Sequence, residues 1–368
     1  MSKSDSNHIL QLDGIRFFAI FFVLIAHWLQ WQSGFFLLKH AEFVHGVTLF
    51  FVLSGFLITR ILFTNRLKYE NHQMPTFELF KSFYIRRFLR IFPIYYLTIA
   101  LLFIIDFKDI KEIYLYLISY TTNIHQSITN SHLDAANHFW SLAVEEQFYI
   151  LWPFVIIFTP LRHLKSVIIG FIVISIATRA YIFYEQGWAW MALDYFPLSC
   201  FQSLAIGGLI AYWTVMKSDW LTKLNQPWII WTAIGLYVVF MYTQSVLEWK
   251  ASKAYIDRLF FSLVAGLIII RASLGAFKHL SAWVLENKFV LYCGKISYGM
   301  YVYHMFMPDL FNFIGPKIGF LATNKYSQFV VYFALTFLLS HLSWKLIENP
   351  INNLKDRFPY FKNKQVAA

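Results

Sequence analysis

The stretch LDGIRFFAIFFVLIAH, residues 12–27, holds Arg16 near its start and His27 at its end, and every residue between these two is apolar. The hydrocarbon core of a bilayer is about 30 Å thick, so a helix needs about 20 mainly apolar residues to cross it. The stretch is therefore predicted to be a membrane-spanning helix. Because polar residues precede it and no small-residue cleavage site follows it, we expect a retained first span and not a removed signal peptide.

The composition of the whole chain favours repeated membrane crossing. Of its 368 residues, 58% are hydrophobic and 14% are charged, and the mean hydropathy is +0.52. Water-soluble domains do not combine these values. The formal charge of +11 is explained by basic cytoplasmic loops, so a lipid bilayer and no nucleic acid is the predicted partner. The two cysteines, Cys200 and Cys293, lie in apolar windows and predict no disulfide framework.

Apolar windows bounded by charged residues, proline and glycine predict an all-α integral membrane protein with about ten spans in one bundle. A further apolar segment, residues 113–124, is short for a crossing and is predicted to be interfacial or re-entrant, with a crossing as the alternative. The ten predicted spans are centred near Leu24, Val52, Thr98, Leu151, Ile174, Ala205, Tyr237, Ala265, Tyr301 and Leu338.

The basic residues predict the orientation of these spans, because cytoplasmic loops collect most of the Lys and Arg of a membrane protein. Seven basic residues lie between positions 60 and 90, whereas the loop 185–194 has none. This distribution predicts that both termini are cytoplasmic. We expect a membrane domain over residues 1–354 and a short basic cytoplasmic tail over residues 355–368, in the inner membrane of the cell.

The pair Arg16 and His27 is the first candidate for chemistry. A charge at the centre of a membrane helix costs about 2.5–3.5 kcal/mol, so an ionisable residue there is a functional candidate. At 100° and 1.5 Å per residue, their spacing puts both side chains on one helix face, about 16 Å apart along the axis. The simpler alternatives are an interfacial anchor for Arg16 and a helix-packing hydrogen bond for His27.

The segment YIRRFLRIFPIYY, residues 84–96, places Arg87 and Arg90 on one helix face just before the predicted third span. Guanidinium groups match phosphate oxygens in a bidentate manner. Arginines at the membrane surface therefore suit a nucleotide or an anionic lipid headgroup. The simpler alternative is that they only set the orientation of the span.

The segment HFWSLAVEEQFYILWPF, residues 138–154, carries polar groups along one stripe of a predicted helix. Ser141, Glu145 and Tyr149 recur at positions i, i+4 and i+8. A carboxylate at this depth must face the interior of the bundle or water. The alternative is a structural role, in which Glu145 pairs with a buried cation such as Arg179.

Further polar residues lie near other predicted spans. The segment GKISYGMYVYHMFMPD, residues 294–309, carries His304 in the outer half of the ninth span, and His341 lies in the tenth. Each of these histidines alone is more typical of helix packing than of catalysis. The histidines lack the spacing of metal ligands, so no metal site is predicted. The small residues Ser54 and Gly55 favour close approach between helices.

Five runs of this sequence, in this order, resemble the membrane acyltransferase-3 family, whose members O-acylate bacterial cell-surface sugars. The resemblance covers essentially the whole chain. The runs are LDGIRFFAIFFVLIAH, GVTLFFVLSGFLIT, FYIRRFLRIFPIYYL, FWSLAVEEQFYILWP and GKISYGMYVYHM. The residues that match the family's arginine–histidine, double-arginine and serine–glutamate motifs are Arg16, His27, Arg87, Arg90, Ser141 and Glu145.

The resemblance implies an acyl-CoA-dependent O-acetyltransferase with no tightly bound cofactor and with acyl-CoA as the donor substrate. A pantetheine arm has a length of the same order as the spacing of about 16 Å between Arg16 and His27. His27 is then a general base or an acyl-accepting nucleophile. The expected site residues are His27 and Glu145 for catalysis, Arg16, Arg87 and Arg90 for the donor, and Ser141, Tyr149 and His304 for the carbohydrate acceptor.

The sequence departs from the family at Thr48, where an aspartate is common, so no role is assigned to a carboxylate there. No extracytoplasmic esterase-like domain of the kind that some members carry is expected, and other envelope-polysaccharide enzymes are candidate partners. The rival function is a transporter or flippase for a lipid-linked or anionic sugar, because buried ionisable residues also mark transport paths. A scaffolding protein would leave the positions of His27 and Glu145 unexplained.

Overall fold

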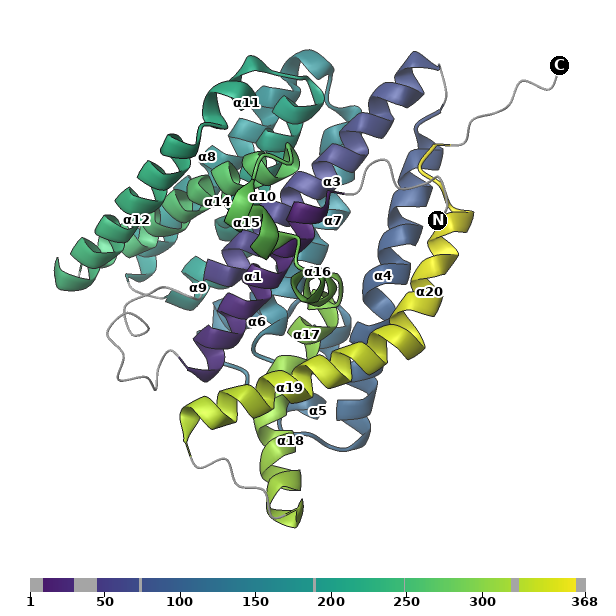
Figure 1. Cartoon of the computed structure of the whole chain (residues 1–368), viewed down its shortest axis with the longest axis vertical. Helices are drawn as coiled ribbons and strands as arrows, with labels where there is room; N and C mark the ends of the chain where they lie inside the picture. Colours follow the sequence, from purple (N-terminus) through teal and green to yellow (C-terminus); the bar gives the residue numbers. More distant parts are fainter. Residues whose placement is uncertain are drawn as a thin grey trace. The chain divides into compact units, whose positions relative to one another are not determined.

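The computed structural model describes residues 9–29, 45–72, 75–187, 190–247, 249–318 and 324–361. Within these ranges every regular element is a helix, and no strand occurs (Figure 1). This result confirms the prediction of an all-α protein. The helices alternate between long apolar elements and short elements that connect them.

Eight helical segments of the described ranges are long and apolar enough to cross a membrane. They confirm a multi-pass membrane protein and coincide with eight of the ten predicted spans. The segments are α1 (Leu10–Trp28), α3 (His45–Asn71), α4 (Phe77–Ile104), α7 (Phe139–Phe158), α8 (Leu161–Gln186), Met191–Val215 within α9 (Trp190–Tyr195) and α10 (Pro197–Val215), α12 (Pro227–Leu247), and Lys325–Arg357, which begins with α19 (Lys325–Ser343) and includes α20 (Asn349–Asn353).

The predicted spans around Ala265 and Tyr301 are not among these eight. The first corresponds to α14 (Arg258–Ser273), which has 16 residues and follows a π-helical turn. The second is interrupted several times, and Pro308 is the second residue of its last helix, where proline is tolerated because it lies in the first turn. Its pieces are α16 (Lys288–Lys295), α17 (Ser297–Tyr303), a 3-10 turn (His304–Phe306) and α18 (Met307–Ile314).

The apolar segment 113–124 does not form one long helix. Its residues belong to α5 (Ile110–Ile118) and α6 (Thr122–Thr129), which have nine and eight residues. Tyr120 lies between them with a φ of 53°, in the left-handed region, and this turn separates the two helices. A nine-residue helix is about 14 Å long, which is too short for a bilayer core. The remaining short α-helices are α11 (Asp219–Leu224), α13 (Lys250–Ser252) and α15 (His279–Leu285).

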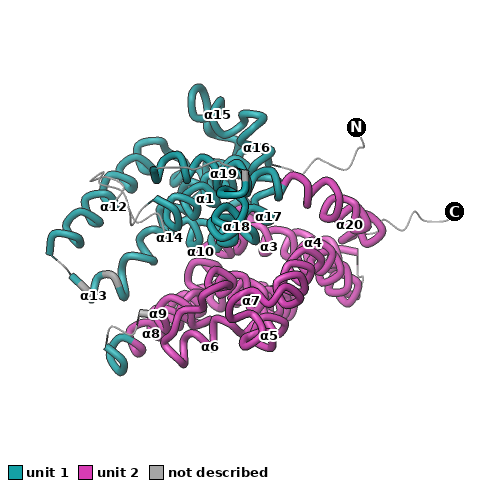
Figure 2. Tube along the Cα trace, turned by 90° about the horizontal axis from the view of Figure 1, so that it is seen from below, with its two compact units in different colours: residues 1–53, 183–188, 217–340 teal, residues 54–182, 189–216, 341–368 magenta. Residues whose placement is uncertain are grey.

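The chain divides into two compact units, each of which is built from separate stretches of sequence (Figure 2). Unit 1 holds residues 1–53, 183–188 and 217–340, and unit 2 holds residues 54–182, 189–216 and 341–368. The single domain predicted over residues 1–354 stays a prediction. Residues 362–368 of the predicted tail lie outside the described residues.

Unit 1 is built around α1, which packs against α15 and α16. Two glycines permit this close approach. A methyl group on Gly14 would overlap the backbone of Leu285, and one on Gly294 would overlap the backbone of Asp13. The start of α1 is therefore held against two short helices that lie more than 250 residues later in the chain.

Unit 2 has a similar close contact between α3 and α10. A methyl group on Gly55 would overlap the backbone of Leu204, which confirms the predicted close approach of helices at this glycine. Nearby, Gly208 leaves room for the ring of Trp152, whose Nε1 donates a 2.6 Å hydrogen bond to Thr59 Oγ1. Backbone contact and a buried polar bond thus join three helices of this unit.

Replacement of Gly55 by alanine is expected to lower the free energy of unfolding by about 1–3 kcal/mol, because the added methyl group overlaps backbone that cannot rotate away. The measurement is the midpoint of thermal unfolding in detergent. The matched control is Gly170→Ala on α8, where no atom lies within 4 Å of the added group. This control should be neutral or stabilising, because alanine is favoured over glycine within a helix by about 1 kcal/mol. Equal midpoints for the two variants would contradict the prediction.

Candidate active site

Helix α1 carries Arg16 and His27 on one uninterrupted helix, as the sequence predicts. The Arg16 guanidinium donates a hydrogen bond to the Asp13 carboxylate one turn earlier and forms an ion pair with it. Asp13 is buried, and the side chain of Arg16 is 18% exposed. The basic end of this helix face therefore contains a partly neutralised arginine that remains accessible.

His27 differs from the residues around it because it is exposed, whereas residues 23–26 and Trp28 are buried. Its Nδ1 lies 3.0 Å from the carbonyl oxygen of Val23 and 3.2 Å from Nε2 of His304. His304 is fully buried, and its own Nδ1 lies 2.6 Å from the Tyr301 carbonyl oxygen. The structure thus brings together two of the predicted site residues, which lie 277 positions apart in the sequence.

Aromatic rings enclose this histidine pair on the side of His304. The centroid of the His304 ring is 4.9 Å from that of His27, 6.2 Å from that of Trp28 and 5.3 Å from that of Tyr301. Trp28 in turn packs edge-on against Phe329. The His304 imidazole is therefore packed among aromatic rings, whereas the His27 imidazole is exposed.

A second group of predicted residues meets within unit 2. Ser54 of α3 donates a 2.8 Å hydrogen bond from Oγ to Oε1 of Glu145 on α7. The Tyr149 hydroxyl interacts with both of these side chains. The predicted stripe of α7 therefore carries an interacting carboxylate and phenol, and α3 adds a hydroxyl that the sequence did not assign to the site.

Two of the three predicted donor-binding arginines, Arg87 and Arg90, belong to this same group. The guanidinium carbon of Arg87 lies 4.1 Å from the centroid of the Tyr149 ring, and Arg87 interacts electrostatically with Glu145 and Glu146. Arg90 is exposed and interacts with Glu145. The sequence motifs predict separate sites for Arg87 and Arg90 and for Glu145, whereas in the structure these residues are neighbours.

Glu146 is, after Ser54, a second member of this group that sequence reasoning did not assign. It is buried, and its Oε1 has no hydrogen-bond partner among the described residues. Two consecutive carboxylates in one apolar helix are a signal that could have identified it, because each is costly in a membrane. Ser141, by contrast, is buried on α7 and donates a 3.3 Å hydrogen bond to the His138 carbonyl oxygen.

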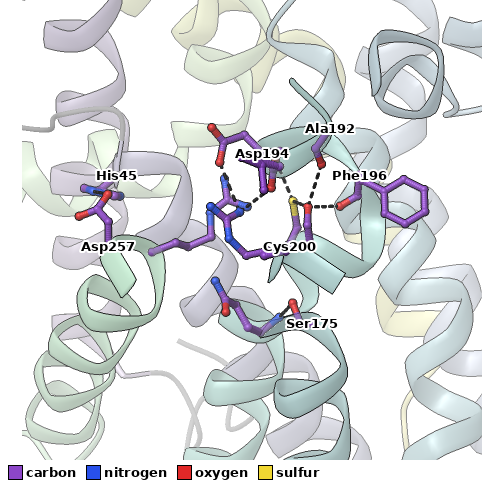
Figure 3. Close-up of polar contacts among 12 residues, drawn as sticks. His45, Ser175, Ala192, Asp194, Phe196, Cys200 and Asp257 are labelled. Atoms are coloured by element: carbon purple, nitrogen blue, oxygen red, sulfur yellow. Dashed lines mark hydrogen bonds and ion pairs between the residues drawn. The ribbon is translucent and has the colours of Figure 1, made fainter. Parts of the chain in front are cut away.

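Arg179 of α8, the alternative partner for Glu145, interacts elsewhere. It donates a hydrogen bond to the Leu193 carbonyl and lies 3.4 Å from Oδ1 of Asp194. The backbone carbonyl of Asp194 also accepts a 2.9 Å hydrogen bond from the Cys200 thiol (Figure 3). This polar group joins α8, α9 and α10 within unit 2 and gives Cys200 a structural position.

Unit 1 contains a further buried polar cluster, which the sequence analysis missed. Nε2 of His45 lies 3.0 Å from Oδ2 of Asp257, and the two side chains face one another in Figure 3. The Tyr237 hydroxyl donates a 3.0 Å hydrogen bond to the other carboxylate oxygen of Asp257, and the His45 ring stacks on Phe261. Asp257 within a predicted apolar window was the available signal.

The sequence matches the family model described as "Acyltransferase domain" over residues 9–345. Similar curated proteins carry the name O-acetyltransferase. The Peptidoglycan O-acetyltransferase OatA of Listeria monocytogenes is 27% identical, over 99% of this chain and 59% of its own length. The O-acetyltransferase OatA of Staphylococcus aureus is 30% identical, over 92% of this chain and 56% of its own length.

This chain spans less than two thirds of the length of these relatives. No solved structure matches it significantly. The matched region contains α1 with its arginine and histidine, the arginines of α4, the carboxylates of α7 and the histidine that follows α17. Because the family model covers nearly the whole chain, this protein belongs to that acyltransferase family.

Proposed function

We propose that this protein is a membrane-embedded O-acyltransferase that moves an acetyl group from acyl-CoA to a hydroxyl of a cell-envelope carbohydrate. Membership of the family and the names of the relatives support acetyl transfer. The observation that carries the proposal is His27, an exposed imidazole among buried residues of a membrane helix. An imidazole is the side chain best suited to exchange protons near neutral pH.

In the proposed reaction, His27 accepts the proton of the acceptor hydroxyl while the oxygen of that hydroxyl attacks the thioester carbon. The carbon–sulfur bond then breaks, and the thiolate of CoA takes up the proton from the imidazolium. The products are the acetyl ester and free CoA thiol. In the alternative route, a ring nitrogen of His27 attacks the thioester carbon, the carbon–sulfur bond breaks, and the CoA thiolate leaves with the imidazole proton. The acceptor hydroxyl then attacks the acyl carbon, the N–C bond breaks, and the hydroxyl proton returns to the imidazole.

The proposed donor residues are Arg16, Arg87 and Arg90, which would bind the phosphates of acyl-CoA from the cytoplasmic side. The contacts of Arg16 and Arg87 with carboxylates give this proposal a specific form, because a phosphate must either displace the carboxylates or share the guanidinium groups with them. The proposed donor site assumes the predicted topology, with ten spans and both termini cytoplasmic. It also assumes that the protein lies in the inner membrane.

The acceptor is proposed to contact polar groups of α7. Glu145 orients the acceptor hydroxyls or the catalytic imidazole, and Tyr149 stacks on a sugar ring or binds its hydroxyls. Ser141 is, with Tyr149, a proposed acceptor-binding residue. The name of the Listeria monocytogenes relative makes peptidoglycan the first acceptor to test.

Purified protein in detergent is expected to release CoA thiol from acetyl-CoA when peptidoglycan fragments are supplied, and the variant His27→Ala should lose this activity by about 100-fold or more. A thiol reagent measures the release, and mass spectrometry detects the acetylated fragment. The control is His72→Ala, which changes an exposed histidine at the end of α3. Full activity in folded His27→Ala would refute the assigned role, and a transporter would release no thiol.

The variants Arg87→Ala and Arg90→Ala are expected to raise the KM for acetyl-CoA by about 10- to 100-fold, because each loses a charge-assisted contact with phosphate. The KM for the acceptor should change much less. Lys68→Ala is the matched control, since it removes an exposed basic residue from the same predicted cytoplasmic surface. If all three variants behaved alike, the arginines would be topological anchors and not donor ligands.

A further inference from the structure

We propose that His304 is a positioning residue, which holds the His27 imidazole with its proton on Nδ1 and its Nε2 bare and accessible. The catalytic consequence of this arrangement rests on the proposed function, whereas the arrangement itself does not. The inference follows from the hydrogen bonds around the two rings. It replaces the acceptor-binding role that the sequence predicts for His304.

The partners of His304 assign its proton. Its Nδ1 lies 2.6 Å from the Tyr301 carbonyl oxygen, and a carbonyl oxygen can only accept, so this nitrogen must carry the proton. A neutral imidazole has one protonated and one bare nitrogen. Nε2 of His304 is therefore an acceptor, and it lies 3.2 Å from Nδ1 of His27.

The partners of His27 then assign the proton of the second ring. Nδ1 of His27 faces two acceptors, the Val23 carbonyl oxygen at 3.0 Å and Nε2 of His304. Only a protonated Nδ1 satisfies both. In a continuous helix the Val23 carbonyl also accepts the backbone N–H of His27, so it is shared between two donors. Nε2 of His304 is therefore the acceptor of Nδ1 that does not also accept a backbone N–H of the helix.

This assignment leaves Nε2 of His27 as the bare nitrogen, and no residue of the described ranges donates a hydrogen bond to it. His27 is exposed, whereas His304 has no exposed surface. The buried ring can thus act only through its neighbour. When Nε2 of His27 takes up a proton, the Nδ1 proton remains bonded to a neutral acceptor that is already in place, and no reorganisation is needed.

Two substitutions separate positioning from other roles. His304→Gln keeps an oxygen or nitrogen at about the distance of Nε2, so its carbonyl can accept from His27, whereas His304→Phe keeps a planar ring of similar size without an acceptor. The first measurement is the rate at which diethyl pyrocarbonate modifies His27, followed by mass spectrometry. In this reaction a ring nitrogen attacks one carbonyl of the reagent, an N–C bond forms, and ethyl carbonate leaves with the Nδ1 proton.

Wild-type protein is expected to be modified at His27 and protected at His304. His304→Phe should slow the modification of His27 by about fivefold or more, which corresponds to the loss of one hydrogen bond, whereas His304→Gln should stay within about twofold of wild type. Thermal unfolding of both variants is measured in parallel. If His27 reacted equally fast in both folded variants, the positioning role would be overturned.

The second measurement is steady-state acetyl transfer. His304→Phe should lower kcat by about fivefold or more at an unchanged KM for the acceptor, and His304→Gln should restore kcat. A raised acceptor KM at unchanged kcat and unchanged His27 reactivity would instead identify His304 as an acceptor ligand and overturn the inference. If the wild-type protein transferred no acetyl group, the proposed function would fail, and the modification rates would still test the arrangement of the two rings.

Discussion

The cost of placing an ionisable side chain in hydrocarbon governs how the buried ionisable residues of the described ranges are arranged. Every buried or half-buried charge described above has a partner of opposite charge or a backbone acceptor within reach. Arg16 pairs with Asp13 on one helix turn, and His45 pairs with Asp257 across two helices. The same requirement collects Arg87 and the carboxylates of α7 into one group. Buried ionisable residues therefore lie in clusters, because a buried charge without a partner has a high free energy.

A second requirement, that buried backbone stays hydrogen-bonded, applies to the broken helical region between α16 and α18. Short helices joined by a 3-10 turn keep most of these bonds while they change the direction of the chain. His304 begins that turn, and its ring bonds to the Tyr301 carbonyl within the preceding turn of helix. The ring of His304 is thus held by a hydrogen bond at the position where the α-helix gives way to the 3-10 turn.

Sequence reasoning succeeded where a single helix decides the geometry. The period of an α-helix and the apolar run between Arg16 and His27 were sufficient to predict their shared helix, and the lengths of the apolar windows located eight spans. It did not find contacts between distant helices. Nothing local in the sequence indicates that Ser54 bonds to Glu145, or that His304 meets His27, because tertiary packing selects these partners.

The two spans that differ from prediction show the same limit. The window around Tyr301 is apolar enough for a crossing, but apolarity does not reveal that the chain breaks into pieces of seven and eight residues. Pro308 was the visible local signal, and proline disfavours continuation of the helix before it. Around Ala265, a π-helical turn precedes a helix of 16 residues, and no composition rule predicts such a turn.

The choice of a histidine as the partner of His27 agrees with the constraint that governs the other polar contacts. A carboxylate beside an imidazole would hold its proton equally well, but it would bring a permanent charge into a membrane helix bundle, with the desolvation cost that this entails. A neutral imidazole that is itself fixed by the Tyr301 carbonyl orients His27 through a hydrogen bond alone. The resting pair is then uncharged, and a positive charge arises on His27 only when its accessible nitrogen takes up a proton.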